Sequence, residues 1–273
     1  MKKNNALLLS TPYILWMLAF TLIPLGVVGY YAVTDPVTGA FTLDNLTQLR
    51  LYMPVLGRSV GYSIVSAIIC LFLGYPVAYY IAQRGKVAQK MLYMLVMLPM
   101  CMSFLLRTLA WKGLLDDTGI INNFLALIGL PRARMVRTSG AVIMGMVYNY
   151  LPYMILPLYS TIVKIDHRLI EAAEDLGCTP LQVFQKVTLP LSMPGIFTGI
   201  TMVFVPAVST FYISQKLGSA DTSLIGDVIE RFFKGNNMNL GAALSLVLMV
   251  LVFVCTGIMN RFGGDDEEGG VVV

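Results

Sequence analysis

Charged side chains are scarce in this sequence. Asp, Glu, Lys and Arg together make up 12% of 273 residues, whereas 57% of the residues are hydrophobic. A chain of this length that folded in water would expose far more apolar surface than one core can bury. The mean hydropathy of +0.74 therefore indicates that lipid surrounds most of the chain. This excludes a soluble enzyme.

The residues that would bind nucleic acid or a metal are also few. The net charge is only +4, and no dense run of Lys and Arg is present, so nucleic acid is not an expected partner. The sequence has one histidine and four cysteines. The cysteines lie far apart, at Cys70, Cys101, Cys178 and Cys255. This spacing fits neither a metal site nor a disulfide pattern, and we interpret them as small buried hydrophobic residues.

Long stretches without Asp, Glu, Lys or Arg indicate the membrane-spanning helices. A charge near the bilayer centre costs roughly 3 kcal/mol, and a spanning helix needs roughly 20 apolar residues. The six predicted spans cover about residues 7–32, 59–83, 91–115, 138–162, 188–213 and 238–260. The third contains Arg107, whose side chain we expect to reach the interface, with Trp111 in the aromatic belt. The predicted fold class is an all-α membrane protein.

The orientation of the spans rests on weaker evidence than their number. Lys and Arg are nearly balanced between the two sides, so the positive-inside rule discriminates little. Lys2, Lys3 and the short basic loop at 84–90 favour a cytoplasmic location for both termini. An acidic run at 265–268 follows the last span, and we expect it to form a disordered tail.

The loop at 164–190 carries the most specific pattern in the chain. Asp166 is a good N-cap, and Gly177 stands where a left-handed C-cap residue belongs. Between them, apolar residues recur at helical spacing: Leu169, Ala172, Ala173 and Leu176. We expect this apolar face to be the buried face of a short amphipathic helix. Its two alanines would let another surface approach the helix backbone closely.

A second short helix is predicted directly after the first. Thr179 and Gln182 form a Thr-x-x-Gln capping box, with Pro180 at the first helical position. Pro190 is expected to end this helix where the fifth span begins. The two helices together suit a docking element in the plane of the membrane surface.

The spacing of this loop resembles the EAA loop of permease subunits of type I ABC importers. The motif positions are Glu171, Ala172, Ala173, Gly177, Leu189 and Pro190. Val187 stands where that family usually has Ile. The resemblance implies a MetI-like permease fold and a coupling helix that sits in a cleft of a cytosolic ATPase. It also implies a cytoplasmic loop, in agreement with the charge argument.

Further segments resemble the B-type permease subunits of spermidine/putrescine importers. They are residues 97–111, 148–157, 189–206 and 241–250. The resemblance implies a polyamine substrate and location in the inner membrane. It further implies a second homologous permease, an ATPase dimer and an extracytoplasmic substrate-binding protein as partners.

The sequence lacks the residues of an autonomous enzyme or pump. No Gly-x-x-x-x-Gly-Lys-Ser/Thr loop is present, so ATP would be bound and hydrolysed by a partner subunit and this chain would hold no cofactor. No Asp, Glu or His lies in the predicted spans. Ion-coupled transporters and intramembrane proteases normally need such residues at membrane depth. A non-catalytic transport subunit is therefore expected.

A cationic substrate would meet only aromatic side chains in these spans. The candidates for its path are Tyr148, Tyr150, Tyr153, Phe204 and Phe211. Aromatic faces attract cations, but the same rings also pack bundles of helices, and the sequence leaves both readings open. High-affinity capture is expected elsewhere, in the binding protein or the second permease. Two alternatives remain: an ABC permease for another small solute, and a six-span channel or scaffold without an ATPase.

Overall fold

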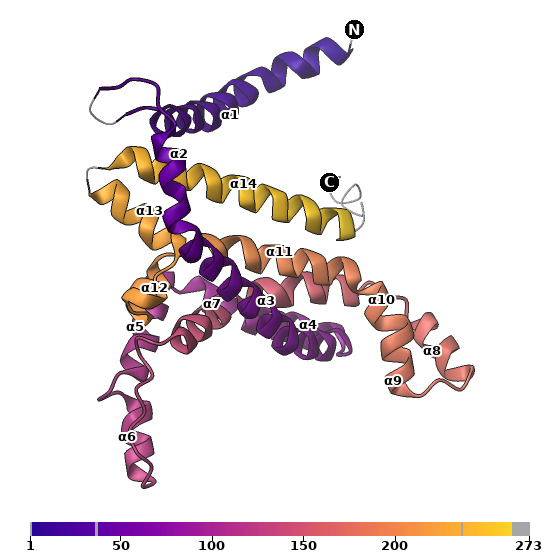
Figure 1. The fold of residues 1–273 in the computed structure, drawn as a ribbon. Coiled ribbons are helices and arrows are strands. Elements are labelled where there is room, and N and C mark those ends of the chain that lie inside the picture. Colours follow the sequence, from indigo (N-terminus) through magenta and orange to yellow (C-terminus); the bar gives the residue numbers. More distant parts are fainter. Residues whose placement is uncertain (1, 36–37, 236, 264–273) are drawn as a thin grey trace. The chain divides into compact units, whose positions relative to one another are not determined.

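The computed structural model describes residues 2–35, 38–235 and 237–263, which form helices joined by short loops (Figure 1). The extended pairing in these residues is one isolated bridge between Thr34 and Phe41. The predicted all-α class is therefore confirmed. The acidic run at 265–268 lies outside the described residues.

Within the described residues, four helices are long and apolar enough to cross a membrane. They comprise Thr11–Ala32 of α1 (Lys2–Ala32), Leu49–Ala82 of η1 (Leu49–Tyr52) and α3 (Met53–Ala82), α7 (Ser139–Ile162), and Met238–Met259 of α14 (Met238–Gly263). Two further pairs of helices pass the same test but are bent, so the number of spans rises to as many as six if each pair counts once.

The predicted third span is not one continuous helix. Helix α4 (Lys86–Met97) continues into the 3-10 turn η2 (Leu98–Cys101), and a new direction starts with α5 (Phe104–Leu115) and α6 (Ile120–Leu127). The two parts differ in direction by 85°. Pro99 lacks an amide hydrogen and lies in the narrower 3-10 turn. Met102 after it has an extended backbone with ψ 148°, which ends the helix. The expectation of a helix that runs on to Leu115 is therefore wrong.

The region before the fifth span stays helical through Pro190, contrary to the predicted stop. Helix α9 (Pro180–Val183) passes through the π-helical turn η3 (Phe184–Thr188) into α10 (Leu189–Leu191). The wider π turn includes Lys186, whose carbonyl would otherwise clash with the Pro190 ring. The chain then bends by 63° into α11 (Met193–Ser209), which is followed by α12 (Tyr212–Leu217).

The chain divides into two compact units. The first consists of Met1–Pro54 and Val228–Leu251 and contains α1, α2 (Asp44–Gln48), most of α13 (Ile225–Lys234) and the first part of α14. Side-chain amides tie it together, because Asn45 donates to the carbonyls of Ala32 and Thr34, and Asn239 also donates to the Thr34 carbonyl. These bonds satisfy carbonyls that the end of α1 leaves free.

The second unit, Val55–Asp227 with Val252–Val273, holds the main bundle of α3, α7 and α11. Two glycines one turn apart on α11 let it approach α7 closely, as small residues do between membrane helices. A Cβ added at Gly195 would lie 2.6 Å from Thr161 Oγ1 and 3.0 Å from the Pro157 carbonyl oxygen, and one at Gly199 would lie 2.7 Å from Met154 Sδ. The contact between these helices therefore depends on glycine.

Buried hydroxyl groups and the half-buried guanidinium of Arg58 connect the bundle to its loops. The Arg58 side chain donates to the carbonyls of Asp221 and Ser223, and the Ser59 hydroxyl accepts from the Ile225 amide at 2.7 Å. At the other end of α3, the hydroxyls of Tyr75 and Ser192 share a hydrogen bond of 2.8 Å. This last bond fixes the bend between α10 and α11.

The contact between α7 and α11 predicts a matched pair of alanine substitutions. Gly195→Ala places a methyl group against the Pro157 carbonyl and is expected to lower stability by about 1–3 kcal/mol through overpacking. Gly61→Ala in α3 meets nothing within 4 Å and is expected to raise stability by up to about 1 kcal/mol. Thermal unfolding of the purified chain in micelles measures both. An equal or higher Tm for Gly195→Ala than for Gly61→Ala would contradict this packing.

Candidate functional site

Helix α8 (His167–Asp175) follows α7 in the sequence and lies beside α9 at one end of the second unit (Figure 1). Its start is capped as predicted, because the Asp166 side chain accepts a hydrogen bond of 3.0 Å from the Arg168 amide. A carboxylate at this position satisfies an amide that has no partner inside the helix and faces the positive end of the helix dipole. The sequence prediction of this helix start is confirmed.

The end of α8 is closed by a complete Schellman motif. Gly177 has φ +81°, and its amide donates to the Glu174 carbonyl at 2.8 Å. The Cys178 amide donates to the Ala173 carbonyl at 3.1 Å. Nothing lies within 4 Å of a Cβ built on Gly177, so the requirement for glycine comes from the left-handed backbone rather than from space.

The capping box of α9 is present as predicted. The Gln182 side chain accepts from the Thr179 amide at 2.9 Å, and the Thr179 hydroxyl accepts from the Gln182 amide at 3.4 Å. Pro180 occupies the first turn, where its missing amide hydrogen costs nothing. Leu189 and Pro190 follow in α10, the first half-buried and the second exposed. The two caps give the loop a fixed shape.

The apolar face of α8 is exposed rather than buried within the chain. Leu176 is 86% exposed, and Leu169 and Ala172 are also exposed, whereas Ala173 is half-buried. Leu181 of the neighbouring α9 adds to this surface. The chain itself does not cover this face, so the expected burial has to come from another surface. An exposed apolar stripe on a doubly capped helix needs another surface to cover it.

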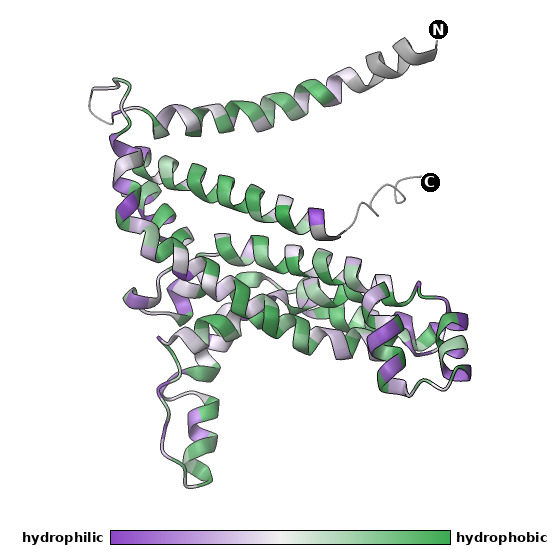
Figure 2. Cartoon of the chain, turned by 45° about the vertical axis from the view of Figure 1, so that its right-hand side comes forward, coloured by the Kyte–Doolittle hydropathy of each residue, from purple (hydrophilic) through white to green (hydrophobic). Residues whose placement is uncertain are grey.

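Carboxylates flank this stripe. Glu171, Glu174 and Asp175 are exposed on α8, so the end of the unit that holds α8 and α9 is hydrophilic, whereas the bundle helices are largely hydrophobic (Figure 2). An apolar stripe bordered by acidic groups fits a partner with an apolar groove and basic rim.

The tyrosines of α7 do not share one face of the helix. The Tyr150 ring is buried, and its hydroxyl donates to the Pro206 carbonyl at 3.3 Å. The half-exposed Tyr153 ring lies 6.3 Å from it, centroid to centroid. Tyr148 instead contacts Trp111 edge to face at 5.2 Å. Tyr150 and Tyr153 therefore form a pair that Tyr148 does not join.

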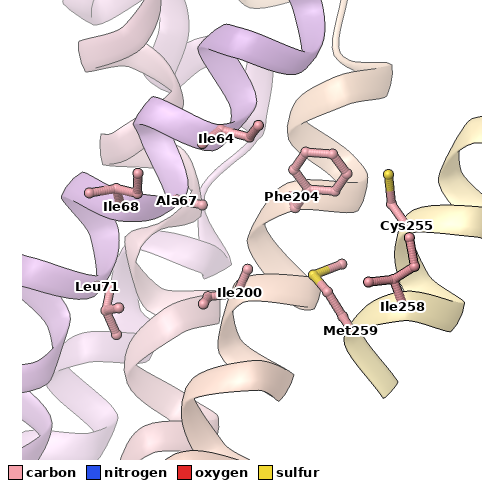
Figure 3. Close-up of a pocket in the computed structure, with 9 residues that line it drawn as sticks. All are labelled: Ile64, Ala67, Ile68, Leu71, Ile200, Phe204, Cys255, Ile258 and Met259. Atoms are coloured by element: carbon pink, nitrogen blue, oxygen red, sulfur yellow. The ribbon is translucent and has the colours of Figure 1, made fainter. Parts of the chain in front are cut away.

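The two candidate phenylalanines, Phe204 and Phe211, have different surroundings from this tyrosine pair. Phe204 lines an apolar cavity of about 340 Å³ together with side chains of α3, α11 and the C-terminal part of α14 (Figure 3). The lining is entirely hydrophobic, for example Ile64, Ile68 and Ile258, and offers nothing to a polar cation. Phe211 is exposed between α11 and α12.

Arg107 is a residue whose position the sequence interpretation got wrong. It is only 8% exposed, and its Nε and Nη1 atoms are buried without a hydrogen-bond partner among the described residues. Helix α5 packs against α7 and α12, and this packing holds the arginine inside the protein. A local sequence pattern gives no signal for such packing.

No group of three or more His, Cys, Asp or Glu side chains in the described part of the chain is arranged to hold a metal ion. The features that remain are apolar helices, a capped docking element at one end and a pair of tyrosines inside. They define a polytopic membrane protein with an exposed, capped helix at one end of its second unit.

Comparison with known proteins identifies the family. Residues 71–263 match the family described as "Binding-protein-dependent transport system inner membrane component". The spermidine/putrescine transport system permease protein PotB of Escherichia coli K12 is 38% identical over 247 residues, which cover 87% of this chain and 90% of that protein. PotB of Haemophilus influenzae is 40% identical, with 87% and 86% covered. The chain belongs to this family of inner-membrane transport components.

Solved structures show the same fold at low sequence identity. A chain of a bacterial ABC transporter involved in the import of the acidic polysaccharide alginate superposes with a TM-score of 0.79 at 19% identity, and 96% of both chains is covered. A chain of the MetNI methionine ABC transporter superposes with a TM-score of 0.62 at 18% identity, and the match covers 80% of this chain and 96% of that one. The predicted type I permease fold is confirmed.

The capping box predicts a local change that hydrogen exchange can detect. Thr179→Ala removes the acceptor for the Gln182 amide and is expected to cost about 0.5–2 kcal/mol of local stability. Amide exchange across 179–183 should therefore accelerate several-fold. Thr179→Ser keeps the hydroxyl and serves as control, and equal exchange rates in both variants would contradict the role of the cap.

Proposed function

We propose that the chain is a permease subunit of an ATP-binding-cassette importer for the polyamines spermidine and putrescine. The single observation that carries the coupling part is the exposed apolar stripe of α8, held between the Asp166 cap and the left-handed Gly177. The identity to PotB proteins over most of the chain supports the substrate class. The chain itself does no chemistry and holds no cofactor.

In this proposal α8 docks into a cytosolic ATPase. Leu169, Ala172 and Leu176 enter an apolar cleft of that subunit, and the carboxylates of Glu171 and Glu174 contact basic groups at its rim. ATP would bind and be hydrolysed in the partner, which moves α8 as a rigid lever. Both chain termini then lie on the cytoplasmic side, as the sequence predicts.

The substrate side of the proposal relies on aromatic rather than acidic groups. Tyr150 and Tyr153 are the candidates for contact with a passing polyamine, because their rings lie together and Tyr153 is half-exposed. A cation–π contact of about 0.5–2 kcal/mol suits transient passage and not capture. Capture is assigned to an extracytoplasmic binding protein. A second homologous permease completes the path.

The two alternatives make different predictions about partners. A channel or scaffold would purify without an ATPase, whereas the importer should retain an ATPase that carries a nucleotide-binding loop. An importer for another small solute would keep the ATPase, but its hydrolysis would not respond to a polyamine-loaded binding protein. Co-purification followed by ATP hydrolysis measurements with spermidine separates the three functions.

The left-handed residue after α8 provides the sharpest test of coupling. Gly177→Val forces a β-branched residue into φ +81° and is expected to cost about 1–2 kcal/mol or more, which distorts the end of α8. In proteoliposomes containing the whole complex, spermidine uptake should fall several-fold relative to ATP hydrolysis. Gly177→Asn is the control, because asparagine tolerates the left-handed region. Normal uptake per ATP hydrolysed in Gly177→Val would contradict the coupling role.

If the tyrosine pair contacts the substrate, loss of the Tyr153 ring should reduce transport more than loss of its hydroxyl. Tyr153→Leu removes the aromatic face and is expected to reduce spermidine transport about two- to five-fold, whereas Tyr153→Phe should transport normally. Tyr148→Leu is the matched control, since that ring packs on Trp111 outside the pair. Unchanged transport in Tyr153→Leu would remove this residue from the path.

A further inference from the structure

Helix α6 and the segment that follows it expose an apolar stripe. Leu127 is 83% exposed and Ile120 69% exposed, and Phe124 and Ile128 are also exposed. Positions 120, 124, 127 and 128 share one face of a helix. Among the described residues of the second unit, none covers this face. The preceding helix α5, in contrast, packs on α7 and α12.

The exposure does not come from a loose helix end. The buried side chain of Asn122 donates to the carbonyls of Asp116 and Ala133, both at 3.0 Å, and accepts from the Ala133 amide at 2.9 Å. These three bonds tie the helix to the loop on each side of it. Gly129, with φ +78°, makes the turn after the helix. Residues 118–134, here named the α6 arm, therefore present the stripe in a fixed orientation.

The α6 arm lies across the direction of the bundle. The chain from Phe104 to Leu127 runs at 85° to the part from Lys86 to Cys101. In Figure 1 the arm projects sideways from the end of the second unit opposite to α8 and α9. If α4 crosses the membrane, the chain from Phe104 to Leu127, at right angles to it, lies in the plane of the membrane surface.

Charges of opposite sign stand at the two ends of the arm. Arg132 and Arg134 are exposed directly after the stripe, whereas Asp116 and Asp117 are exposed just before the helix, and no Asp or Glu lies between 118 and 134. A helix with an apolar face and nearby arginines is the pattern of segments that lie in the lipid interface. Arginines at that depth bind the phosphates of anionic lipids.

We propose that the α6 arm is an interfacial anchor in the outer leaflet of the membrane. Ile120, Phe124 and Leu127 insert among the acyl chains, and Arg132 and Arg134 bind lipid phosphates. The anchor fixes the plane of α5, which carries the buried Arg107 against the bundle. The outer leaflet follows from the proposed function, because that function puts the opposite end of the unit, with α8, in the cytosol.

The experiment uses the full chain in its transporter complex, reconstituted in nanodiscs, with its native cysteines replaced by serine. A bimane label is attached at Leu127→Cys or, as matched control, at the exposed neighbour Ala126→Cys, about 100° around the helix. Lipids with a doxyl quencher near the headgroup and aqueous iodide report the depth of each label. The Leu127 label should be quenched several-fold more by the lipid than the Ala126 label, and the Ala126 label more by iodide.

A second readout tests the arginines. Adding phosphatidylglycerol to phosphatidylcholine discs should strengthen lipid quenching at Leu127 several-fold, and Arg132→Ser with Arg134→Ser should abolish that increase. A Leu127 label that iodide quenches as strongly as the Ala126 label would overturn the anchor. The anchor would also be overturned if iodide reached the Leu127 label and the binding protein, when added, blocked that access. That result would make the face a protein-docking surface.

The quenching measurements need neither ATP nor substrate. Failure of lipid insertion would remove the anchor and leave the proposed function standing. Absence of an ATPase from the purified complex would instead overturn the proposed function, while the depth of the Leu127 label would remain a valid measurement.

Discussion

The close contact of α7 with α11 is the constraint on which the rest of the second unit depends. In lipid the hydrophobic effect does not bring two apolar helices together. Their association therefore depends on close approach of the backbones and on interlocking side chains. Gly195 and Gly199 permit this approach at Pro157 and Met154. The loop at 164–190 connects these same two helices, so its ends are held together by their contact. The hydrogen bond between Tyr75 and Ser192 adds α3 to the same corner.

This arrangement gives α8 a mechanical connection to the bundle. A helix with both ends capped moves as one body, and α9, whose start is capped by Thr179 and Gln182, packs against it. A displacement of α8 therefore reaches α7 on one side and, through the π turn and the bend at Ser192, α11 on the other. Tyr150 of α7 is bonded to the Pro206 carbonyl of α11, so a shift between these helices also moves the tyrosine pair.

The sequence predicted those features that local chemistry decides. The caps at Asp166, Gly177 and Thr179 were predictable because each depends on hydrogen bonds within a few residues, and the apolar stretches follow from the cost of charge in lipid. The periodic pattern of α8 shows that one face needs covering but not which chain covers it. The burial of Arg107 was missed because it depends on how α5 packs against α7 and α12. Pro99 removes one amide donor, but the direction of the resulting 85° turn is set by tertiary packing.

The central claim is that the exposed face of α8 seats in a nucleotide-hydrolysing partner. The most direct measurement is disulfide or short-linker cross-linking from Ala173→Cys, the half-buried residue of that helix, to cysteines placed along the cleft of the co-purified ATPase. The account predicts a cross-link to the ATPase that changes in yield when ATP is added. Labelling of Ala173→Cys by an impermeant reagent from the extracytoplasmic side, with no cross-link to the ATPase, would contradict it.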